Sequence, residues 1–520
     1  MDVDPGPRDR AKGQYFTPPA LAAQVARAVV GCLPKAIRVL DPAAGDGRML
    51  EAVRALCPDA ELIGLERDPE LAARARKRVR GGVIITCESL FDAPRIAYDV
   101  DAVVGNPPYV RSIRLREADP ELWRRIKGAF DATSHGEWDL YAAFIERALS
   151  FVNRGGRIGL ITPSRWWTAS FARLLRARVA SSVREVIDFG ATQLFEGATT
   201  YASVTVLEKE TRARVVRVSR STERGWEYGR VASKTLGAAP WRFPVGAVAA
   251  KLELCAARSR SLGSVAKIVK GAGTNADGVF VIEDCVIEKS IVRGTTALGV
   301  AEVELAATRA CVRGRDVAAF GRVDERVRCI VPYDGDRAIA WRELARRWPK
   351  TAAHLERARA LLEAREKGRF TGDRFHLFGR PQNLAFHADP APKVIVPDVA
   401  RAGRAMVDDR GALVLDSAYA IRGSLDPDLI ALIMGSPIVA LWLQHAGVPL
   451  RGGYVRLKTA YLEPMPIPRR SRALDDATAL AARGAIDEAM ERLRVAYGLD
   501  EKLWGDARAE SVPPRRARRA

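Results

Sequence analysis

The first 210 residues alternate short runs of aliphatic and β-branched residues with segments whose apolar residues recur at helical spacing. Because side chains repeat every 2 residues along a strand and every 3.6 along a helix, this alternation indicates strands joined by crossover helices. Seven segments have strand character: 37–41, 61–66, 82–86, 100–105, 157–162, 183–189 and 203–209. Helical spacing is clearest at 69–79 and 139–152. The pattern predicts an α/β fold with a Rossmann-like, doubly wound sheet.

The pattern changes near residue 231, where short strands and Arg-rich helices begin and no internal repeat is found. A chain of 520 residues is also too long for one ordinary core, so more than one domain is expected. We predict a first domain at 1–230, a second domain of mixed α and β structure at 231–470, and a helical extension at 471–520. The last eight residues, PPRRARRA, are expected to be disordered.

Charge and composition limit the kinds of partner and ligand that are expected. The formal net charge is +20, of which +12 lies in residues 231–470, and this favours a polyanion such as nucleic acid. The seven cysteines form no CxxC pair and are expected to be reduced, buried thiols of a cytoplasmic protein. The five histidines have no metal-ligand spacing, so no metal site is expected. The sequence has no apolar run of about 18 residues, so neither export nor membrane insertion is expected.

Two acidic residues stand where predicted strands end. Asp41 precedes a turn that contains Gly45 and Gly47, and such a turn lets the backbone approach a ligand, although a tight turn also needs glycine for steric reasons alone. Glu66 ends the next strand, where a carboxylate can accept hydrogen bonds from two ribose hydroxyls; the alternative is a solvated helix-capping acid. GxGxxG and a Walker lysine are absent. The pattern favours a nucleoside cofactor without a pyrophosphate, and S-adenosylmethionine fits.

Asn-Pro-Pro-Tyr, residues 106–109, follows the fourth predicted strand. Open α/β sheets bind ligands at this carboxyl edge. The two prolines stiffen the turn and leave carbonyl groups free to accept hydrogen bonds. The Asn106 amide oxygen and the Pro107 carbonyl can accept both protons of an exocyclic amine, which localises its lone pair, while Tyr109 can stack on the heteroaromatic ring. The motif therefore predicts a site for an aromatic amine.

With these motifs the chain resembles the gamma-class amino DNA methyltransferases of the TaqI-like and Eco57I-like kind. The matching stretches occur in that family's order: GQYFTPPALAAQVA, VLDPAAGDG, GLERDP, DAVVGNPPYV, WDLYAAFIERAL, GGRIGLITPSRWW and FGATQLFEGATTYASVTVLEK. The resemblance implies an S-adenosylmethionine-dependent methyltransferase domain built on a seven-stranded mixed sheet.

The resemblance also assigns roles to individual residues. Thr17 and Pro18 match the segment at the methionine part of the cofactor, Asp41 and the turn with Ala43, Gly45 and Gly47 match its amino-acid end, and Glu66 matches the ribose ligand. Asn106, Pro107, Pro108 and Tyr109 match the catalytic motif, with Asn106 also beside the cofactor, and Phe195 matches the second aromatic that packs on a flipped adenine. Without the family, Phe195 is a core aromatic.

The chain departs from the family after the third predicted strand. The family usually has an acidic residue followed by an aromatic one there to hold the cofactor adenine, whereas this chain has CESLFD at 87–92. Glu88, Ser89 and Asp92 compete for the polar role, with Leu90 or Phe91 as the apolar partner.

The second domain resembles the family's target-recognition domain, in stretches such as IVKGAGTNADGVFVI, CVRGRDVAAF and FGRPQNLAF. Five cations next to turns are candidates for contact with DNA: Arg313, Arg315, Arg380, Arg451 and Lys458. The alternative for each of them is a place on a solvated basic face.

These observations predict a methyltransferase acting on N6 of adenine in double-stranded DNA by base flipping, in a restriction-modification or phage-defence system. Three alternatives are a cytosine-N4 DNA methyltransferase, a protein-glutamine methyltransferase, and a non-catalytic DNA-recognition subunit with a methylase fold. Only 12 residues precede Gly13, so no fused nuclease is expected, and a separate restriction endonuclease or defence subunit is the expected protein partner.

Overall fold

The structure is a computed structural model that describes residues 16–34, 36–190, 192, 194–195, 201–222, 225–256, 259–446 and 454–511. The chain forms two compact units, Met1–Gly246 and Ala247–Ala520. The sequence predicts boundaries after residues 230 and 470, whereas the units divide after Gly246, because the segment that follows residue 230 packs into the first core. Within the described part of the chain, no helix has both the length and the apolar composition needed to cross a membrane.

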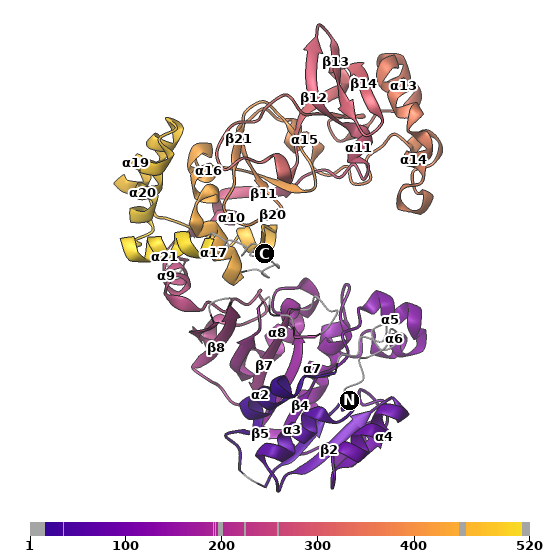
Figure 1. Ribbon diagram of the computed structural model, residues 1–520, viewed down its shortest axis with the longest axis vertical. Coiled ribbons are helices and arrows are strands. Elements are labelled where there is room, and N and C mark those ends of the chain that lie inside the picture. Colours follow the sequence, from indigo (N-terminus) through magenta and orange to yellow (C-terminus); the bar gives the residue numbers. More distant parts are fainter. Residues whose placement is uncertain are drawn as a thin grey trace, which may run out of the picture. The chain divides into compact units, whose positions relative to one another are not determined.

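A nine-stranded sheet forms the centre of the first unit (Figure 1). Its strands are β1 (Arg38–Asp41), β2 (Glu61–Glu66), β3 (Val83–Thr86), β4 (Val100–Gly105), β5 (Val152–Pro163), β6 (Val183–Asp188), β7 (Ala202–Glu208), β8 (Val215–Thr222) and β9 (Gly225–Ala232). Their order is β3-β2-β1-β4-β5-β7-β6-β8-β9, with β7 antiparallel to both neighbours. All seven predicted strands are present, and the mixed Rossmann-like sheet is confirmed.

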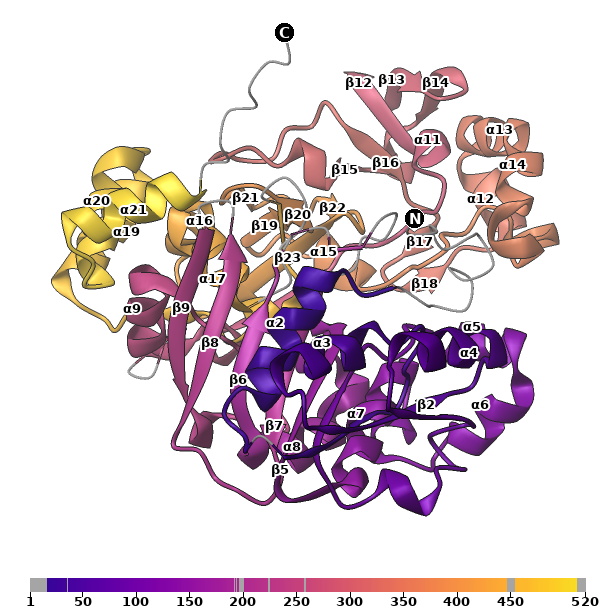
Figure 2. The ribbon, with the colours of Figure 1, turned by 60° about the horizontal axis from the view of Figure 1, so that its bottom comes forward.

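The last two strands extend the sheet beyond the prediction. β8 runs parallel to β6, and β9 returns antiparallel to β8. Figure 2 shows β9, β8 and β6 side by side at one end of the sheet. β9 is an edge strand with one buried residue, so its sequence lacks the apolar alternation by which the other strands were recognised.

Helices cover both faces of this sheet. They are α2 (Pro19–Val30), α3 (Arg48–Leu56), α4 (Pro69–Arg78), α5 (Ser112–Ala118), α6 (Pro120–Ile126), α7 (Leu140–Phe151) and α8 (Arg173–Val179). Neighbouring strand residues belong to opposite cores: Val39 packs with α2 and α3, whereas Leu40 packs with α7 and α8. This alternation produces three layers, with the sheet buried between two helical layers.

The second unit contains two main sheets. Six strands have the order β14-β13-β12-β16-β15-β22: β12 (Val281–Glu288), β13 (Ile291–Thr296), β14 (Gly299–Glu304), β15 (Thr308–Val312), β16 (Arg328–Ile330) and β22 (Leu413–Val414). Four strands have the order β11-β23-β19-β21: β11 (Ala266–Lys270), β19 (Lys393–Pro397), β21 (Met406–Asp408) and β23 (Ala418–Gly423). The predicted mixture of α and β structure is confirmed.

The predicted helical extension consists of α19 (Arg472–Ala482), α20 (Ile486–Ala496) and α21 (Glu501–Ser511). Leu474, Met490 and Trp504 bury these three helices in one core with α16 (Pro427–Gly435) and α17 (Pro437–Ala446). The extension is therefore part of the second unit. Its last eight residues, which the sequence predicts to be disordered, lie outside the described residues.

Candidate active site

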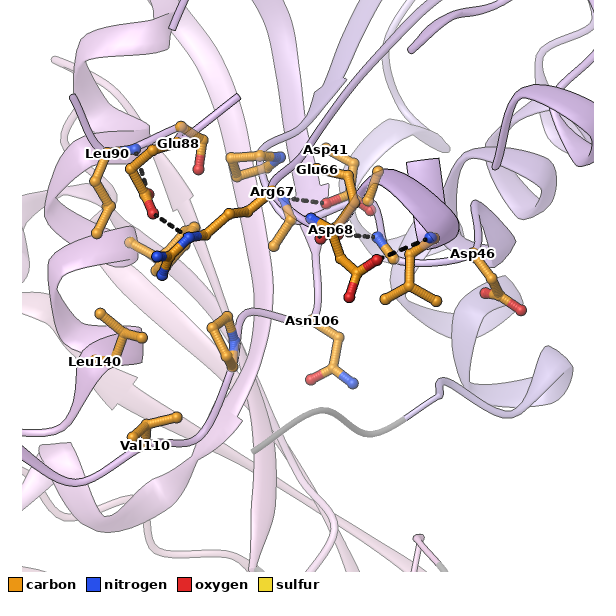
Figure 3. Close-up of a pocket in the computed structure, with 18 of the residues that line it drawn as sticks. Asp41, Asp46, Glu66, Arg67, Asp68, Glu88, Leu90, Asn106, Val110 and Leu140 are labelled. Carbon is orange, nitrogen blue, oxygen red and sulfur yellow. Dashed lines mark hydrogen bonds and ion pairs between the residues drawn. The ribbon is translucent and has the colours of Figure 1, made fainter. Parts of the chain in front are cut away.

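A cavity of about 600 Å³ opens at the carboxyl ends of β1, β2 and β4. Parallel strands end at the same edge of a sheet, so residues far apart in the sequence meet there (Figure 3). Ten of the predicted site residues line this cavity: Thr17, Asp41, Ala43, Gly45, Glu66, Glu88, Ser89, Leu90, Asn106 and Pro108. Pro18, Gly47, Pro107, Tyr109 and Phe195 are not among its lining residues.

Glu66 is nearly buried at the end of β2 and holds the glycine turn in place. The Gly45 amide donates to its Oε2 at 2.8 Å, and the Asp68 amide donates to its Oε1 at 2.8 Å. Burial nevertheless raises the pKa of this carboxyl above its usual range. The Arg67 amide also contributes a hydrogen bond to this carboxyl. Since a carboxylate has about four acceptor sites, three backbone donors leave room for a hydrogen bond from a ligand.

Asp41 ends β1 and is 1% exposed. Its Oδ1 accepts a hydrogen bond of 3.0 Å from the Ala43 amide. Burial, together with the nearby Glu66 charge, raises the pKa of Asp41 to about 8. The ionised form of Asp41 is therefore disfavoured, and a positively charged ligand group beside the carboxyl would stabilise it.

The two glycines of the turn have different reasons to be glycine. Gly45 has φ +55°, lines the cavity, and has open space where a Cβ would be. Gly47 has φ +88°, and a Cβ on it would lie 2.8 Å from Val79 Cγ2, so its small size also serves the packing of α3 against α4. A similar restriction applies to Gly105, where a Cβ would lie 2.6 Å from Asp41 Oδ1.

The segment after β3 turns Glu88, Ser89 and Leu90 toward the cavity. The Leu90 amide donates to Glu88 Oε1 at 3.2 Å, and burial raises the pKa of Glu88. Asp92 is more than half exposed and forms an ion pair with Arg125 at 3.2 Å instead. Phe91 stacks beneath the same guanidinium group, 4.4 Å from its ring centroid. Of the competing residues, those at 88–90 are the ones that face the cavity.

Part of the cavity wall was not anticipated from the sequence. Helices α5 and α6 and the residue between them, Asp119, contribute Arg114, Leu115, Ala118, Asp119 and Leu122. Asp119 caps α6 through the Leu122 amide, a helix start that the DPE sequence indicates, but its position over the cavity is a tertiary feature.

Arg67 ties this wall to the turn after β2. Its guanidinium lies 2.6 Å from Asp119 Oδ2 and 3.7 Å from Glu88 Oε2, and the latter pair is drawn in Figure 3. The hydrogen bond from Arg67 lowers the pKa of the Asp119 carboxyl. One cation therefore connects three segments around the cavity: the β2 end, the segment after β3, and the start of α6.

Asn106 follows β4, and its side-chain amide lies between two hydroxyl groups. Its Nδ2 donates to Thr17 Oγ1 at 3.3 Å, and its Oδ1 accepts from the Tyr109 hydroxyl at 2.7 Å. The same hydroxyl is 3.1 Å from the Ile161 carbonyl oxygen of β5. The next residues are held by the backbone, because the Leu140 amide donates to the Val110 carbonyl at 2.8 Å. These bonds fix the conformation of the loop.

The Tyr109 ring lies between two other aromatic rings. Its centroid is 6.1 Å from that of Tyr141 and 6.3 Å from that of Phe195, both in edge-to-face orientation. Phe195 is 4% exposed and belongs to the core between the sheet and α2. The structure thus brings together the two aromatic residues that the sequence predicted to act on one base.

The cations predicted to contact DNA have different environments in the second unit. Arg313 is 8% exposed and pairs with Asp316 at 2.7 Å and Glu283 at 2.5 Å. Arg315 is exposed and pairs with the same Glu283 at 2.7 Å. Arg380 is exposed beside a turn, and its amide donates to the Gly273 carbonyl. Lys458 is exposed before the short helix at 459–462, and Arg451 lies outside the described residues.

The described histidine and cysteine side chains are not grouped as metal ligands. Among the residues that the structure describes, no group of three or more His, Cys, Asp or Glu side chains is arranged to hold a metal ion. His354, His376 and His387 are buried, and each lies within hydrogen-bonding distance of a backbone carbonyl. All seven cysteines are free thiols. Three of them, Cys57, Cys311 and Cys329, are buried as expected, whereas Cys87, Cys255 and Cys285 are half-buried and Cys32 is exposed, which corrects the expectation for these four.

Comparison with known proteins finds similar sequences among restriction-modification methylases. Residues 88–195 match the Eco57I restriction-modification methylase family. The Type II methyltransferase M.XhoI of Xanthomonas vasicola is 25% identical over 442 residues, which cover 78% of this chain and 76% of the relative. The Type II methyltransferase M.BanIII of Aneurinibacillus aneurinilyticus is 29% identical over 222 residues, which cover 37% of this chain and 37% of the relative.

A solved structure supports the same fold over most of the chain. The Type IIL restriction-modification enzyme MmeI, solved in complex with DNA, aligns with a TM-score of 0.58 and 13% identity, covering 95% of this chain and 74% of that one. The strand order and the cavity at the sheet edge are therefore accompanied by two sequence similarities: residues 88–195 are similar to the Eco57I restriction-modification methylase family, and most of the chain is similar to a Type II methyltransferase.

Proposed function

We propose that the protein transfers a methyl group from S-adenosylmethionine to N6 of an adenine that is flipped out of a specific duplex DNA sequence. The observation that carries this proposal is the position of Asn106. Its amide lines the same cavity as Glu66 and Asp41, so an amine acceptor and the groups suited to a nucleoside cofactor share one site.

The residues around the cavity fit S-adenosylmethionine, the cofactor that the methyltransferase relatives imply. The Glu66 carboxylate lines the cavity and suits a ribose hydroxyl, and the Asp41 carboxyl suits an ammonium group. Glu88, Ser89 and Leu90 offer polar and apolar contacts to an adenine ring, and Thr17 lies beside Asn106. The cofactor supplies a methyl group made electrophilic by a sulfonium, and the protein aligns it with the amine.

Asn106 and Pro107 are the groups we assign to the amine. An exocyclic amine is a poor nucleophile because its lone pair is delocalised into the ring. Hydrogen bonds from its two protons to the Asn106 Oδ1 and the Pro107 carbonyl localise the lone pair on nitrogen. Their contribution is greatest as the new carbon–nitrogen bond forms, which is where binding energy accelerates a reaction.

The paired base cannot present its amine in this geometry, so it has to leave the helix. Unstacking costs a few kcal/mol, and stacking on aromatic side chains returns about 1–3 kcal/mol per base. Tyr109 and Phe195 are the candidates for this contact. Since the two rings now meet edge to face, we expect at least one of them to turn when a base enters.

Asn106→Ala tests the catalytic assignment directly. Loss of one well-placed electrostatic partner costs about 10²–10³ in rate, whereas affinity for DNA should change little. Methyl transfer from tritiated cofactor reports the rate, and a gel-shift titration reports affinity. A folded Asn106→Ala protein with normal turnover would remove this residue from the chemistry.

One alternative concerns the base that is methylated. Cytosine N4 is the same kind of amine, and Asn before Pro-Pro-Tyr only favours adenine. Single-molecule sequencing of DNA from cells expressing the protein distinguishes the two bases and maps the site. Absence of both marks, with specific DNA binding retained, would favour the third possibility of a non-catalytic recognition subunit.

The second unit is our candidate for reading the DNA sequence. Of the cations predicted to contact DNA, Arg315, Arg380 and Lys458 are exposed, and Arg451 remains a candidate outside the described residues. The buried ion pairs of Arg313 favour a role in holding the Glu283–Arg315 region in place. A separate restriction endonuclease or another defence subunit is the protein partner we propose.

A further inference from the structure

One turn in the second unit has an unusual backbone. It follows helix α14 (Arg359–Glu363), which is labelled in Figure 1. Glu366 has φ +47°, Lys367 has φ +59°, and Gly368 continues the run with φ +81°. The left-handed conformation is easy for glycine, but it costs energy for a residue with a Cβ, which stays there only where the surrounding structure requires it. The fold therefore maintains a strained turn at this point.

Buried contacts hold the turn on both sides of Lys367. Arg365 is 8% exposed, and Phe370, which lies beneath its guanidinium at 5.1 Å, is 4% exposed. The same guanidinium donates to the backbone carbonyl oxygens of three residues, at 2.6, 2.6 and 2.9 Å: Thr274, Phe375 and Leu377. Between these two buried residues the Lys367 side chain is exposed. The surrounding structure thus fixes the backbone of a lysine that points to solvent.

The turn also meets a second cation through Asn275. The Glu366 carboxylate accepts a hydrogen bond from the Asn275 side chain. Gly379 approaches the same side chain so closely that a Cβ on it would lie 2.5 Å from the Asn275 Cγ. Lys367 and Arg380 follow Glu366 and Gly379 in the chain, and both are exposed. Two segments that are distant in sequence therefore place their cations at one junction.

Positive charge dominates this part of the surface. Residues 365–380 contain five cationic and two acidic side chains. Four of the cations are exposed: Lys367, Arg369, Arg374 and Arg380. Arg369 lies 3.5 Å from Glu366, whereas no ion pair within the described ranges involves any of the other three. Exposed cations that lack a nearby counter-charge attract a polyanion.

We propose that the exposed cations of residues 365–380, with Lys367 foremost, bind the phosphate backbone of duplex DNA independently of its base sequence. This inference rests on the proposed function, which makes duplex DNA the substrate. A row of phosphates complements a row of cations, and a backbone that is already fixed loses less entropy when a phosphate is bound. Of these four cations only Arg380 is predicted from the sequence to contact DNA.

Lys367→Gln removes the charge and keeps a polar side chain of similar reach. Each phosphate contact contributes about 0.9 to the slope of log affinity against log salt, so the slope for the variant should be smaller by about this amount. Its loss of affinity relative to the wild-type protein should then shrink about threefold between about 50 and 200 mM KCl. Fluorescence anisotropy of a labelled duplex with the site mapped by sequencing measures both. Lys367→Arg, which keeps the charge, should retain the wild-type slope.

A duplex with the mapped site scrambled distinguishes phosphates from bases. Phosphate contacts carry no sequence information, so Lys367→Gln should weaken binding of the two duplexes by the same factor. Weakening confined to the mapped site would mean that Lys367 reads a base, and it would overturn the assignment to the backbone.

Lys289→Gln is the matched control. Lys289 is also an exposed lysine of the second unit with a left-handed backbone, φ +55°, and it lies in the turn between β12 and β13. The variant loses the same charge at another place on the unit, so its salt slope should equal that of the wild-type protein. An equal change in both variants would attribute the effect to net charge and overturn a localised surface.

Lys367→Gly separates the strain from the charge. Glycine adopts the left-handed conformation without cost, so the melting temperature should be kept or raised while the salt slope falls as it does for Lys367→Gln. Folded Lys367 variants without the charge that keep the wild-type slope would overturn the inference. In that case the proposed function stands if the wild-type protein methylates its site. A wild-type protein that neither binds nor methylates DNA would overturn both.

Discussion

At Asp41, burial can couple the binding of a ligand to the release of a proton. The carboxyl ionises near pH 3.8 in the unfolded chain, but in the folded protein burial raises its pKa to about 8. The folded state therefore retains a proton that the unfolded state has lost. As pH rises between these two values, the contribution of Asp41 to the free energy of unfolding declines, and it is lost once the folded group also ionises.

A cationic cofactor group beside Asp41 would favour the ionised form of this carboxyl over the protonated form. Binding should lower the pKa of this carboxyl and release about one proton near pH 7. Calorimetry in two buffers with different ionisation enthalpies measures the number released. Asp41→Asn should release fewer protons, whereas Asp59→Asn, a change at an exposed carboxyl, should match the wild-type protein. Equal release from the Asp41 variant would separate this group from the cofactor.

Glu66 provides a second test at the same scale. Hydrogen bonds to a charged group contribute about 1.5–3 kcal/mol, so Glu66→Ala should weaken S-adenosylmethionine binding about tenfold or more. Glu61→Ala lies on the same strand but begins it at an exposed position, and it serves as the control. Part of the loss would come from the Gly45 and Asp68 amides, which would lose their acceptor. Unchanged affinity would exclude Glu66 from the site.

Among the secondary-structure elements, α5 and α6 are linked to the turn after β2 through Arg67. Arg67 pairs with Asp119 and Glu88, and it is itself more than half exposed. Exposed ion pairs contribute only about 0.2–1 kcal/mol, so the pairing should tune this wall of the cavity without being essential to the fold.

We expect Arg67→Ala to speed the release of S-adenosylmethionine by about two- to fivefold, with little change in thermal stability. Arg95→Ala, which removes the exposed pair with Asp99 away from the cavity, is the control. Stopped-flow displacement of the cofactor measures the rate. High salt should reduce the difference between Arg67→Ala and the wild-type protein, because exposed charges are screened. An unaltered release rate at low salt would mean that this ion pair does not restrain the wall.

Helices and strands could be predicted from the sequence where the apolar pattern of the element lies within one continuous segment. β1, β2 and β4 are apolar runs that end in Asp41, Glu66 and Gly105, so their strands and the site edge followed together. β9 could not be recognised, because an edge strand with one buried residue has little apolar pattern. The choice among residues 88–92 required the tertiary structure, since only the turn geometry decides which side chains face the cavity.

The DNA candidates show a similar limit. Arg313 and Arg315 are neighbouring cations in one turn, and nothing local distinguishes them. The structure buries the first between two carboxylates and leaves the second exposed. Both cations pair with the long-range partner Glu283, so the difference in accessibility comes from the burial of the Arg313 side chain, which the fold rather than the neighbouring sequence sets.

For the whole molecule, the position of the boundary between the units determines how much of the net charge is counted in each of them. Counted over Met1–Gly246 and Ala247–Ala520, the net charge is +9 and +11, so the excess is not confined to the second unit. Phosphate contacts are nonspecific and depend on salt. A first unit studied alone should therefore keep part of the salt-dependent affinity for DNA while losing sequence discrimination, if the second unit reads the site.

The place of the cut determines whether that experiment is meaningful. A fragment ending at residue 230 interrupts β9 and removes two buried aromatics of the first core, Trp241 and Phe243. Their rings lie 5.1 Å from Trp166 and 4.9 Å from Trp167. The cut also removes the carbonyl groups of residues 238 and 239, which accept hydrogen bonds from the buried Arg176.

Fragments 1–246 and 1–230 should therefore differ sharply. Removing one large buried aromatic side chain costs about 3–5 kcal/mol, and total stabilities are only about 5–15 kcal/mol, so the shorter fragment should unfold or aggregate. The longer one should fold cooperatively in urea, bind S-adenosylmethionine like the full chain, and bind DNA with a smaller salt dependence and no preference for the mapped site. Calorimetry and gel shifts measure these properties. Site-specific binding by fragment 1–246 would assign recognition to the first unit, and a stable 1–230 fragment would show that the segment after β9 is peripheral to the core.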